Sequence, residues 1–367
     1  MSIKLHWYLP TNGDGRTPHE SGTTVAVGGN LELGRTRKPD LEYLSAVAGA
    51  AEANGFDAVL TPTGTYCEDA WISTAALSQI HRRLRYLVAF RPGTISPALA
   101  ARQAATFQRH SNGRLLINIV TGGSDVEQRR FGDPLDKDGR YARCDEFLTI
   151  FKGVWDSPGF DFRGDHLWVE GGTIPTPTTR PEIYFGGSSD AALRVAAKHA
   201  DVYLTWGEPP TKYLADHLDT VRELAAAAGR SVRFGIRFHV VGRETSAEAW
   251  QAADALLADV DAETIAHQQR AQAQSSAVGL QRMRALHQGD RDNLEIYPNV
   301  WAGIGLVRPG AGTALVGSYA EVASRLAEYH RKLGIDEFIL SGYPCDEEAF
   351  HVGEGIVPEL RKLGLVE

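Results

Sequence analysis

The chain alternates short apolar segments with longer amphipathic ones, and this rhythm restricts the folds open to it. Eight short segments have the apolar, β-branched and aromatic content of buried strands: Leu5–Leu9, Ala58–Leu60, Tyr86–Phe90, Leu115–Val120, Ile183–Phe185, Val202–Thr205, Phe234–Val241 and Phe338–Ser341. Helical periodicity marks the stretches between them, such as Leu41–Asn54, Pro97–His110, Tyr141–Val154, Ala191–His199 and Tyr213–Ala228. Eight strand–helix units without a domain-scale change in composition predict one α/β domain over residues 1–367, a TIM (β/α)8 barrel.

A doubly wound dinucleotide-binding sheet is the main alternative fold. That fold carries a G-x-G-x-x-G turn after its first strand. After Leu9 this chain continues Pro10-Thr11-Asn12-Gly13-Asp14-Gly15, which is a different pattern. The barrel is therefore favoured.

Three stretches exceed what a minimal barrel needs. Residues 12–38 form a Gly- and Thr-rich segment without periodicity, which predicts a long loop after the first strand. Alternation over residues 160–171 predicts a small hairpin that turns at Arg163–His166. The largest insertion is expected between strands seven and eight, where residues 259–313 would cover the top of the barrel.

Three recognisable parts follow the seventh predicted strand. Thr245-Ser246-Ala247-Glu248 has the pattern of a capping box and predicts a helix that continues to about Leu257. A second helix is predicted from Glu263 to His287. A loop over Trp301–Gly312 follows, and we expect it to act as a mobile lid.

Charge and composition exclude several classes of function. The net charge is −8 and the sequence contains no Lys- or Arg-rich block, so nucleic acid and membrane surfaces are not expected as partners. Apolar runs stay short of the roughly 18 residues that a membrane span needs. Three scattered cysteines without metal-ligand spacing favour a cytoplasmic protein and argue against a metal site.

An arginine and a histidine occupy the carboxyl end of the seventh predicted strand. The period of two places Arg237 and His239 on the same side of this strand, opposite Phe234, Ile236 and Phe238. Active sites of TIM barrels form at the carboxyl ends of the strands. Because a buried cation without a partner is costly, this pair predicts an anionic ligand, although a structural Arg–His pair is also compatible with the pattern.

Other polar residues also follow predicted strands. Gly186-Gly187-Ser188-Ser189-Asp190 leads directly into a helix, so it is either a phosphate-binding turn or a simple turn with a serine N-cap. The same two interpretations apply to the turn that begins at Thr121. Cys67 precedes two carboxylates, Glu68 and Asp69, which would raise the pKa of its thiol, so we do not expect covalent catalysis there.

Motifs along nearly the whole chain resemble one family, the bacterial-luciferase-like flavin monooxygenases, and within it the alkanesulfonate monooxygenases. The motifs are Trp7–Thr11 with Gly13–Gly15, Pro62–Gly64 with Cys67–Trp71, Ser96–Pro97 with Ala101–Thr106, Tyr184–Asp190, Leu204–Pro210, Gly305–Arg308 and Leu340–Pro344. The resemblance implies a two-component enzyme, in which an NAD(P)H-dependent FMN reductase supplies reduced FMN (FMNH2). With O2, the flavin would cleave an organosulfonate at its carbon–sulfur bond to give an aldehyde and sulfite. Relatives of this kind are homodimers or homotetramers.

The resemblance also implies roles for individual residues, position by position. Catalytic roles fall on Arg237, His239 and Tyr343, and substrate binding on Trp206, Arg308 and Asn12. Cofactor binding falls on Cys67, Asn118, Thr121, Tyr141, Gly187, Ser188 and Ser189. A sulfonate has three acceptor oxygens, which suits arginine forks, an imidazolium and an indole N–H. Arg308 would arrive on the lid loop and exclude water.

One departure bears on the substrate. The alkanesulfonate enzymes carry a histidine where this chain has Asn12, and the loop that follows is longer here, with polar residues such as His19, Glu20, Asn30 and Arg35. An amide and a polar loop suit a hydroxylated carbon skeleton, so the substrate is either a sulfosugar such as sulfoquinovose or a simple alkanesulfonate. An F420- or FMN-dependent hydride-transfer enzyme on the same barrel is the alternative function.

Overall fold

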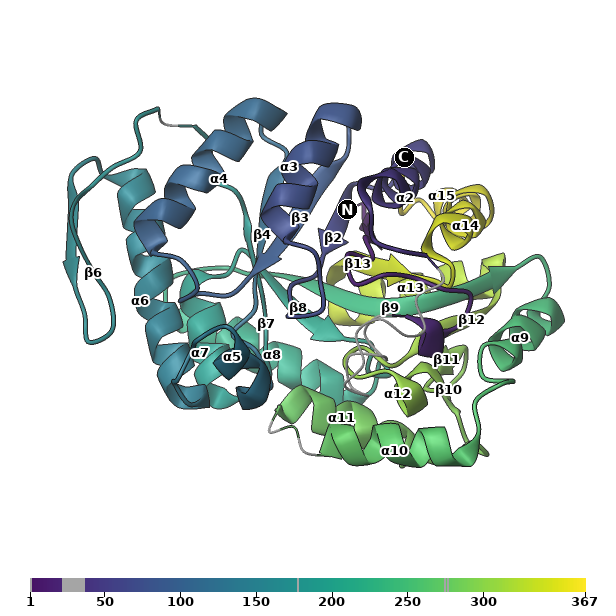
Figure 1. Ribbon diagram of the computed structural model, residues 1–367. Helices are drawn as coiled ribbons and strands as arrows, with labels where there is room; N and C mark the ends of the chain where they lie inside the picture. The colour runs from purple at the N-terminus through teal and green to yellow at the C-terminus, as the bar shows by residue number, and fades with distance from the viewer. Residues whose placement is uncertain (1, 22–36, 177, 274, 276) are drawn as a thin grey trace.

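The computed structural model describes residues 2–21, 37–176, 178–273, 275 and 277–367, and in this part of the chain eight parallel strands close into a barrel (Figure 1). These strands are β1 (Lys4–Tyr8), β2 (Ala58–Thr61), β3 (Arg85–Phe90), β4 (Leu115–Ile119), β7 (Ile183–Gly186), β8 (Val202–Trp206), β9 (Arg233–Arg243) and β13 (Ile335–Ser341). Their order is β9-β13-β1-β2-β3-β4-β7-β8, and pairing of β8 with β9 closes the ring. The predicted fold class is confirmed, and each predicted strand overlaps an observed one.

Helices follow the strands and pack around the barrel (Figure 1). They are α2 (Leu41–Ala53), α3 (Ala70–Ile80), α4 (Pro97–Ser111), α5 (Asp125–Arg130), α6 (Lys137–Asp156), α7 (Asp190–His199), α8 (Lys212–Ala227) and α13 (Tyr319–Leu333). Side chains at their starts cap them: Asp40, Ser96 and Ser189 each accept a hydrogen bond from a backbone N–H three residues later. The chain ends with α14 (Cys345–Phe350), a π-helical turn over His351–Ile356 and α15 (Val357–Lys362).

The largest insertion lies between β9 and β13, as predicted. It begins with α9 (Ser246–Ala255), whose capping box between Thr245 and Glu248 is confirmed. The prediction of one helix from Glu263 to His287 is wrong, because two helices occupy this stretch: α10 (Ala262–Ala273) and α11 (Val278–His287). Serine side chains compete with the helical backbone for hydrogen bonds, and Ser275 between the helices instead accepts one from the N–H of Ala277.

The end of the insertion adds strands that the sequence did not indicate. β12 (Ala314–Ser318) pairs in parallel with the last part of β9, and β11 (Val300–Trp301) and β10 (Glu295–Tyr297) continue the sheet in antiparallel pairs. Between β11 and β12, a short helix α12 (Ile304–Val307) buries its apolar side chains and ends at Arg308. A packed helix thus carries Arg308, and the predicted motion of this segment stays a prediction.

The loop predicted after the first strand lies partly outside the described residues, which omit 22–36 and with them Asn30 and Arg35. Its described part includes a 3-10 turn over Pro18–Glu20 and a β-bridge between Asp14 and Arg37. The hairpin predicted over 160–171 is confirmed as β5 (Phe160–Arg163) paired with β6 (Trp168–Gly172).

A buried carboxylate ties together the amino-terminal ends of several barrel strands. Glu337 of β13 is fully buried and accepts hydrogen bonds from Tyr184 (2.6 Å), from Arg233 and at the His6 ring (2.9 Å). Burial opposes the charge of Glu337, but its contacts with His6, Tyr184 and Arg233 outweigh that cost and lower the pKa to about 2. The network is a structural element at the end of the barrel opposite the expected active site.

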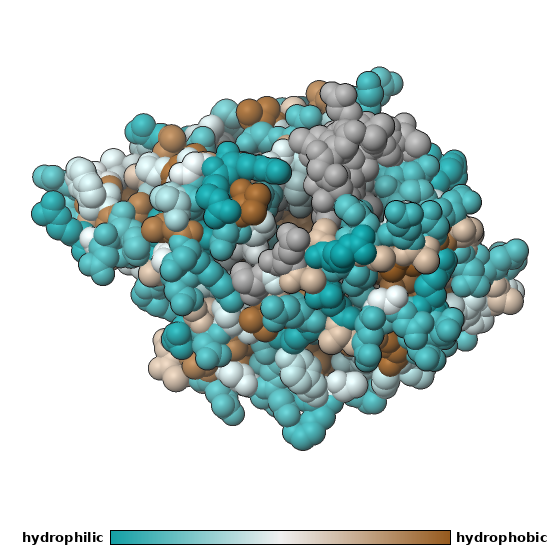
Figure 2. Space-filling view, turned by 60° about the horizontal axis from the view of Figure 1, so that its bottom comes forward, coloured by the Kyte–Doolittle hydropathy of each residue, from teal (hydrophilic) through white to brown (hydrophobic). Residues whose placement is uncertain are grey.

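The outer surface is polar where it can be seen. Figure 2 shows a face on which hydrophilic residues predominate and apolar ones are scattered among them. Among the described residues, no helix is both long and apolar enough to cross a membrane.

Candidate active site

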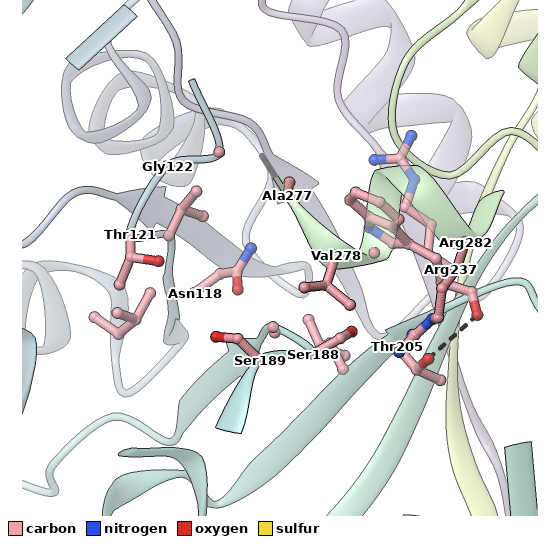
Figure 3. A pocket seen from close by; sticks show the side chains of 18 of the residues that line it. Asn118, Thr121, Gly122, Ser188, Ser189, Thr205, Arg237, Ala277, Val278 and Arg282 are labelled. Atoms are coloured by element: carbon pink, nitrogen blue, oxygen red, sulfur yellow. Dashed lines mark hydrogen bonds between the residues drawn. The ribbon is translucent and has the colours of Figure 1, made fainter. Parts of the chain in front are cut away.

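A cavity of about 260 Å³ opens at the carboxyl ends of β4, β7 and β8 (Figure 3). Most of the residues predicted to bind a cofactor line it: Asn118, Thr121, Tyr141, Gly187, Ser188 and Ser189. Trp206 and Arg237, predicted for substrate binding and catalysis, line the same cavity. The structure therefore brings together eight predicted site residues from four barrel strands and α6.

The turn from β7 into α7 forms one wall of this cavity. Gly187 has φ +151°, and a Cβ there would lie 2.7 Å from Cβ of Ala192 and 3.2 Å from the Tyr141 hydroxyl. Ser189 caps α7 through a hydrogen bond from the N–H of Ala192 (3.4 Å). The serine cap is therefore confirmed, and the turn also lines the cavity, where phosphate binding stays a prediction.

The rest of the lining suits a flat, partly polar ring system. Leu60, Ile119, Val120, Leu204 and Ile339 supply apolar surface, and Asn118 and Thr121 supply hydrogen-bonding groups. With a phosphate at the Gly187–Ser189 turn, these residues fit the isoalloxazine ring and the phosphate of FMN. We therefore regard the cavity as the candidate cofactor site.

Two cationic residues of this cavity were not predicted. Lys137 begins α6 four residues before Tyr141, so the two lie on the same helix face. Lys137 makes no ion pair or hydrogen bond with any residue in the described part of the chain. Its spacing from Tyr141 was a signal that sequence reasoning missed. Arg282 comes from α11 of the insertion, where no motif marks it.

Two guanidinium groups share one aromatic ring at the edge of the cavity. Cζ of Arg237 lies 4.3 Å from the centroid of the Tyr8 ring, and Cζ of Arg308 lies 5.7 Å from it. Nε and Nη2 of Arg237 and Nε of Arg308 are buried without a hydrogen-bond partner among the described residues, and neither arginine pairs with a described carboxylate. Burial and the charge of Arg308 lower the pKa of Arg237 to about 10.

His239 lies beside Arg308 in a fixed protonation state. Nη1 of Arg308 lies 2.9 Å from Nε2 of His239, and the Ser341 hydroxyl lies 2.9 Å from Nδ1. Because a guanidinium can only donate, Nε2 is the acceptor and Nδ1 carries the proton. Burial, Arg308 and Arg237 lower the pKa of His239 well below its usual value, so the expectation of an imidazolium is wrong for this arrangement.

Tyr343 and Asn12 complete this cluster. The Tyr343 ring stacks on His239 with centroids 5.2 Å apart and planes 14° apart, and burial raises the pKa of its hydroxyl to about 12. Asn12 is 1 % exposed, and its Oδ1 accepts a hydrogen bond of 2.9 Å from the Tyr8 hydroxyl. Asn12 thus helps to fix the ring over which both guanidiniums lie.

Cys67 is the predicted cofactor residue that does not line this cavity. It lines a separate cavity of about 610 Å³ beside the ends of β2 and β3, together with Trp71, Phe90 and Arg91. The described residues contain no group of three or more His, Cys, Asp and Glu side chains that could hold a metal ion.

Comparison with known proteins gives one family and many structures of the same fold. A family model described as luciferase-like monooxygenase matches residues 3–337. A riboflavin lyase, solved with modified FMN and riboflavin, has a TM-score of 0.79 at 20 % identity, and the match covers 100 % of this chain and 93 % of that one. A long-chain alkane monooxygenase has a TM-score of 0.79 at 18 % identity, with the same coverage. EDTA monooxygenase from Chelativorans sp. BNC1 has a TM-score of 0.75 at 20 % identity, covering 100 % and 95 %.

Proposed function

The chain belongs to the luciferase-like monooxygenase family, a family of flavin-dependent enzymes, and from this premise we propose that it uses FMNH2 and O2 to cleave an organosulfonate. The proposed reaction converts R–CH2–SO3⁻, O2 and FMNH2 into an aldehyde, hydrogen sulfite, oxidised FMN and water. A separate NAD(P)H-dependent reductase would supply the reduced flavin. The enzyme would thus be the oxygenating component of a two-component system.

The observation that carries the proposal is the pair of buried guanidiniums over Tyr8. Arg237 and Arg308 have unpartnered N–H groups and no carboxylate partner among the described residues. Two like charges in a buried site repel, and an anion between them would relieve both the repulsion and the unpaired donors. A sulfonate supplies three acceptor oxygens and one negative charge for this site.

The cofactor would occupy the neighbouring cavity. Ser188, Ser189 and Tyr141 would contact the phosphate, and Lys137 would supply positive charge from the same face of α6. Asn118 and Thr121 would lie along the ring, and Cys67 would support it from the side of the second cavity. Bound FMNH2 would supply the two electrons that activate O2.

The residues around Tyr8 and His239 would then have separate roles in binding the substrate and in the proton transfer. Arg237 and Arg308 bind and orient the sulfonate, and the Trp206 ring packs against the substrate beside the cavity. When the sulfonate draws the Arg308 guanidinium away, Nε2 of His239 is free to accept a proton from the α-carbon, while Ser341 keeps its contact with Nδ1. Tyr343 holds the imidazole plane by stacking and stays a neutral phenol.

Two substrate classes satisfy these groups: a sulfosugar such as sulfoquinovose and a simple alkanesulfonate. Both carry the primary sulfonate that the two arginines would bind. Asn12 accepts a hydrogen bond from the Tyr8 hydroxyl. It would therefore act on either substrate by holding the Tyr8 ring in place. Both substrate classes would therefore use the same anion site. They would differ in the protein groups that contact the carbon skeleton.

Reconstitution of the whole reaction tests the proposal. The protein is mixed with a flavin reductase, NADH, FMN, O2 and a sulfonate, and sulfite and aldehyde are measured together. Equal amounts of both products, lost when O2 or the reductase is omitted, would support the proposal. Absence of sulfite from every sulfonate, with oxidation of an alcohol by F420 or FMN in its place, would favour hydride transfer.

A further inference from the structure

A partly buried ion pair joins the barrel to the insertion beside the candidate cofactor cavity. Nε of Arg282 donates a hydrogen bond of 2.8 Å to Oε1 of Glu208, and Nη2 lies 2.6 Å from the same oxygen. Glu208 is 4 % exposed and lies two residues after the end of β8, whereas Arg282 belongs to α11. The pair therefore links two elements that are 74 residues apart in sequence.

The barrel side of this link is held firmly. Thr205 donates a hydrogen bond of 2.8 Å to the other carboxylate oxygen of Glu208, and the Tyr329 hydroxyl of α13 donates one of 2.8 Å to its carbonyl. The Thr313 hydroxyl donates to the preceding carbonyl, that of Gly207 (2.7 Å). Glu208 thus offers α11 a fixed, charged anchor.

The insertion side of the link covers the cofactor cavity. Ala277 and Val278 line the cavity opposite the turn that contains Ser188 (Figure 3). A Cβ at Gly279 would lie 3.1 Å from the Trp206 ring and 3.7 Å from Oγ of Ser188, so the first turn of α11 packs against both residues. Just before this helix, the Ser275 hydroxyl donates to the carbonyl of Gly123 on the far side of the cavity (3.2 Å).

Arg282 lines the cavity, but the contact with Glu208 already neutralises its charge. A ligand anion would therefore bind to Lys137 and the turn before α7, because the charge of Arg282 is already compensated. The geometry suits Arg282 to a positioning role, because its guanidinium is bound to the barrel while the start of its helix contacts Trp206 and Ser188.

We propose that Glu208 and Arg282 are positioning residues that hold the first turn of α11 over the cavity and thereby retain the flavin. The inference rests on the proposed function only in naming FMN as the ligand of the cavity. Breaking the pair would free the start of α11 to move away from Trp206 and Ser188. The flavin would then dissociate faster, while the barrel itself would stay folded.

Arg282→Met is the test variant, and Arg282→Lys is the conservative variant that keeps the positive charge. Arg325→Met is the matched control. Arg325 pairs with Glu328 and lies 4.7 Å over the Tyr297 ring, much as Arg282 lies 5.5 Å over Tyr213, and their side chains are 15 % and 17 % exposed. Arg325 lines none of the cavities described above.

Two measurements read the effect: hydrogen exchange of the α11 amides in flavin-free protein, and the rate at which FMN dissociates. For Arg282→Met we expect both to rise by about tenfold or more, in keeping with the loss of a charged hydrogen bond. Arg282→Lys should return both to within about threefold of wild type, and Arg325→Met should leave both unchanged.

Wild-type values for both measurements in Arg282→Met would overturn the inference, and so would an equal rise in Arg325→Met. If Arg282→Met does not fold, Gly279→Ala tests directly whether the packing of the first turn of α11 retains the flavin, because its Cβ would lie 3.1 Å from the Trp206 ring. Unchanged FMN dissociation in Gly279→Ala would also overturn the inference. Failure of wild type to bind FMN would contradict the proposed function instead, and the exchange measurement would still decide the role of the ion pair.

Discussion

Nη1 of Arg308 donates a hydrogen bond of 2.9 Å to Nε2 of His239, so an arginine of the insertion occupies the only basic nitrogen of a barrel histidine. The same guanidinium lies near the Tyr8 ring beside Arg237. A substrate anion that binds Arg308 would therefore also release Nε2 of His239. Anion binding and the exposure of a base are coupled in this arrangement.

Removal of Arg308 should damage turnover of the sulfonate far more than binding of the flavin. Arg308→Ala leaves Arg237 without its partner on the anion, and loss of one buried charged contact costs about 2–5 kcal/mol, or roughly 30- to 4000-fold in kcat/KM. FMN affinity should change less than about twofold, because Arg308 does not line the candidate cofactor cavity.

The control for this variant is Arg291→Ala, an arginine of the same insertion that donates to the carbonyls of Leu257 and Val260. Steady-state kinetics and FMN titration of both variants separate the two roles. A parallel loss of flavin affinity and of turnover in Arg308→Ala would mean that Arg308 serves the cofactor.

The pH profile of kcat/KM should lack an acid limb near the ordinary pKa of histidine. Burial and two arginines lower the pKa of His239 well below 6.5, so its basic form persists as the pH falls through that value. In Arg308→Ala, one of these charges is absent and the acid limb should move to higher pH. An acid limb near 6.5 in wild type that disappears in His239→Gln would show that the site is more hydrated than this account requires.

Lys137 should distinguish FMN from riboflavin. Lys137→Met removes a cation from the proposed phosphate site of the cavity, and loss of the charged hydrogen bond proposed there, worth about 1.5–3 kcal/mol, should weaken FMN binding roughly 10- to 150-fold. Riboflavin lacks the phosphate, so its affinity should not change. Fluorescence titration with both flavins measures the difference.

Lys212→Met is the matched control, since Lys212 lies on α8 with its side chain 85 % exposed and pairs with Asp216. It removes the same charge from the protein but leaves the cavity intact. Equal weakening of FMN and riboflavin in Lys137→Met would assign Lys137 a structural role.

The buried carboxylate of Glu337 should make the barrel sensitive to acid. Its pKa is lowered from 4.5 to about 2, so its contribution to stability is complete above about pH 4.5 and is lost as the pH falls towards 2. Glu337→Gln should lower the free energy of unfolding by about 3–5 kcal/mol at neutral pH, with a smaller difference at about pH 3.

Urea unfolding at both pH values measures this change, and Glu347→Gln is the control because its carboxylate is 46 % exposed. An equal destabilisation by Glu337→Gln at both pH values would show that the network does not depend on the charge of Glu337.

The fold could be predicted because local patterns determine it. Eight apolar segments and their intervening helices were visible in the sequence, and capping residues such as Thr245 and Ser189 marked helix starts. The end of the insertion was harder to predict from the sequence. Each residue of β12 pairs with a residue of β9 that lies 75 positions earlier (Ala314 with His239, for example), and no local pattern reports which partner such a short segment will find.

Strand-end residues of the candidate site were predicted from the barrel topology, and Tyr141 of α6 and Arg308 after α12 only from the family resemblance, whereas the helix residues Lys137 and Arg282 were missed. Ser188 follows β7, Trp206 ends β8 and Arg237 pairs in register with Trp206, so the barrel topology alone brings them together. Arg282 reaches the cavity from α11, and its position depends on the pairing with Glu208, which is a tertiary contact. The protonation state of His239 likewise depends on the packing of Arg308 against it.

A substrate panel tests the central claim most directly. Sulfite release is measured under the reconstituted conditions with octanesulfonate, methanesulfonate and sulfoquinovose, and oxidation of dimethyl sulfone, an uncharged relative, is measured beside them. The account predicts turnover of at least one sulfonate, no turnover of the sulfone, and loss of the sulfonate activity in Arg237→Met. Equal turnover of sulfone and sulfonates, or sulfonate turnover that survives Arg237→Met, would contradict it.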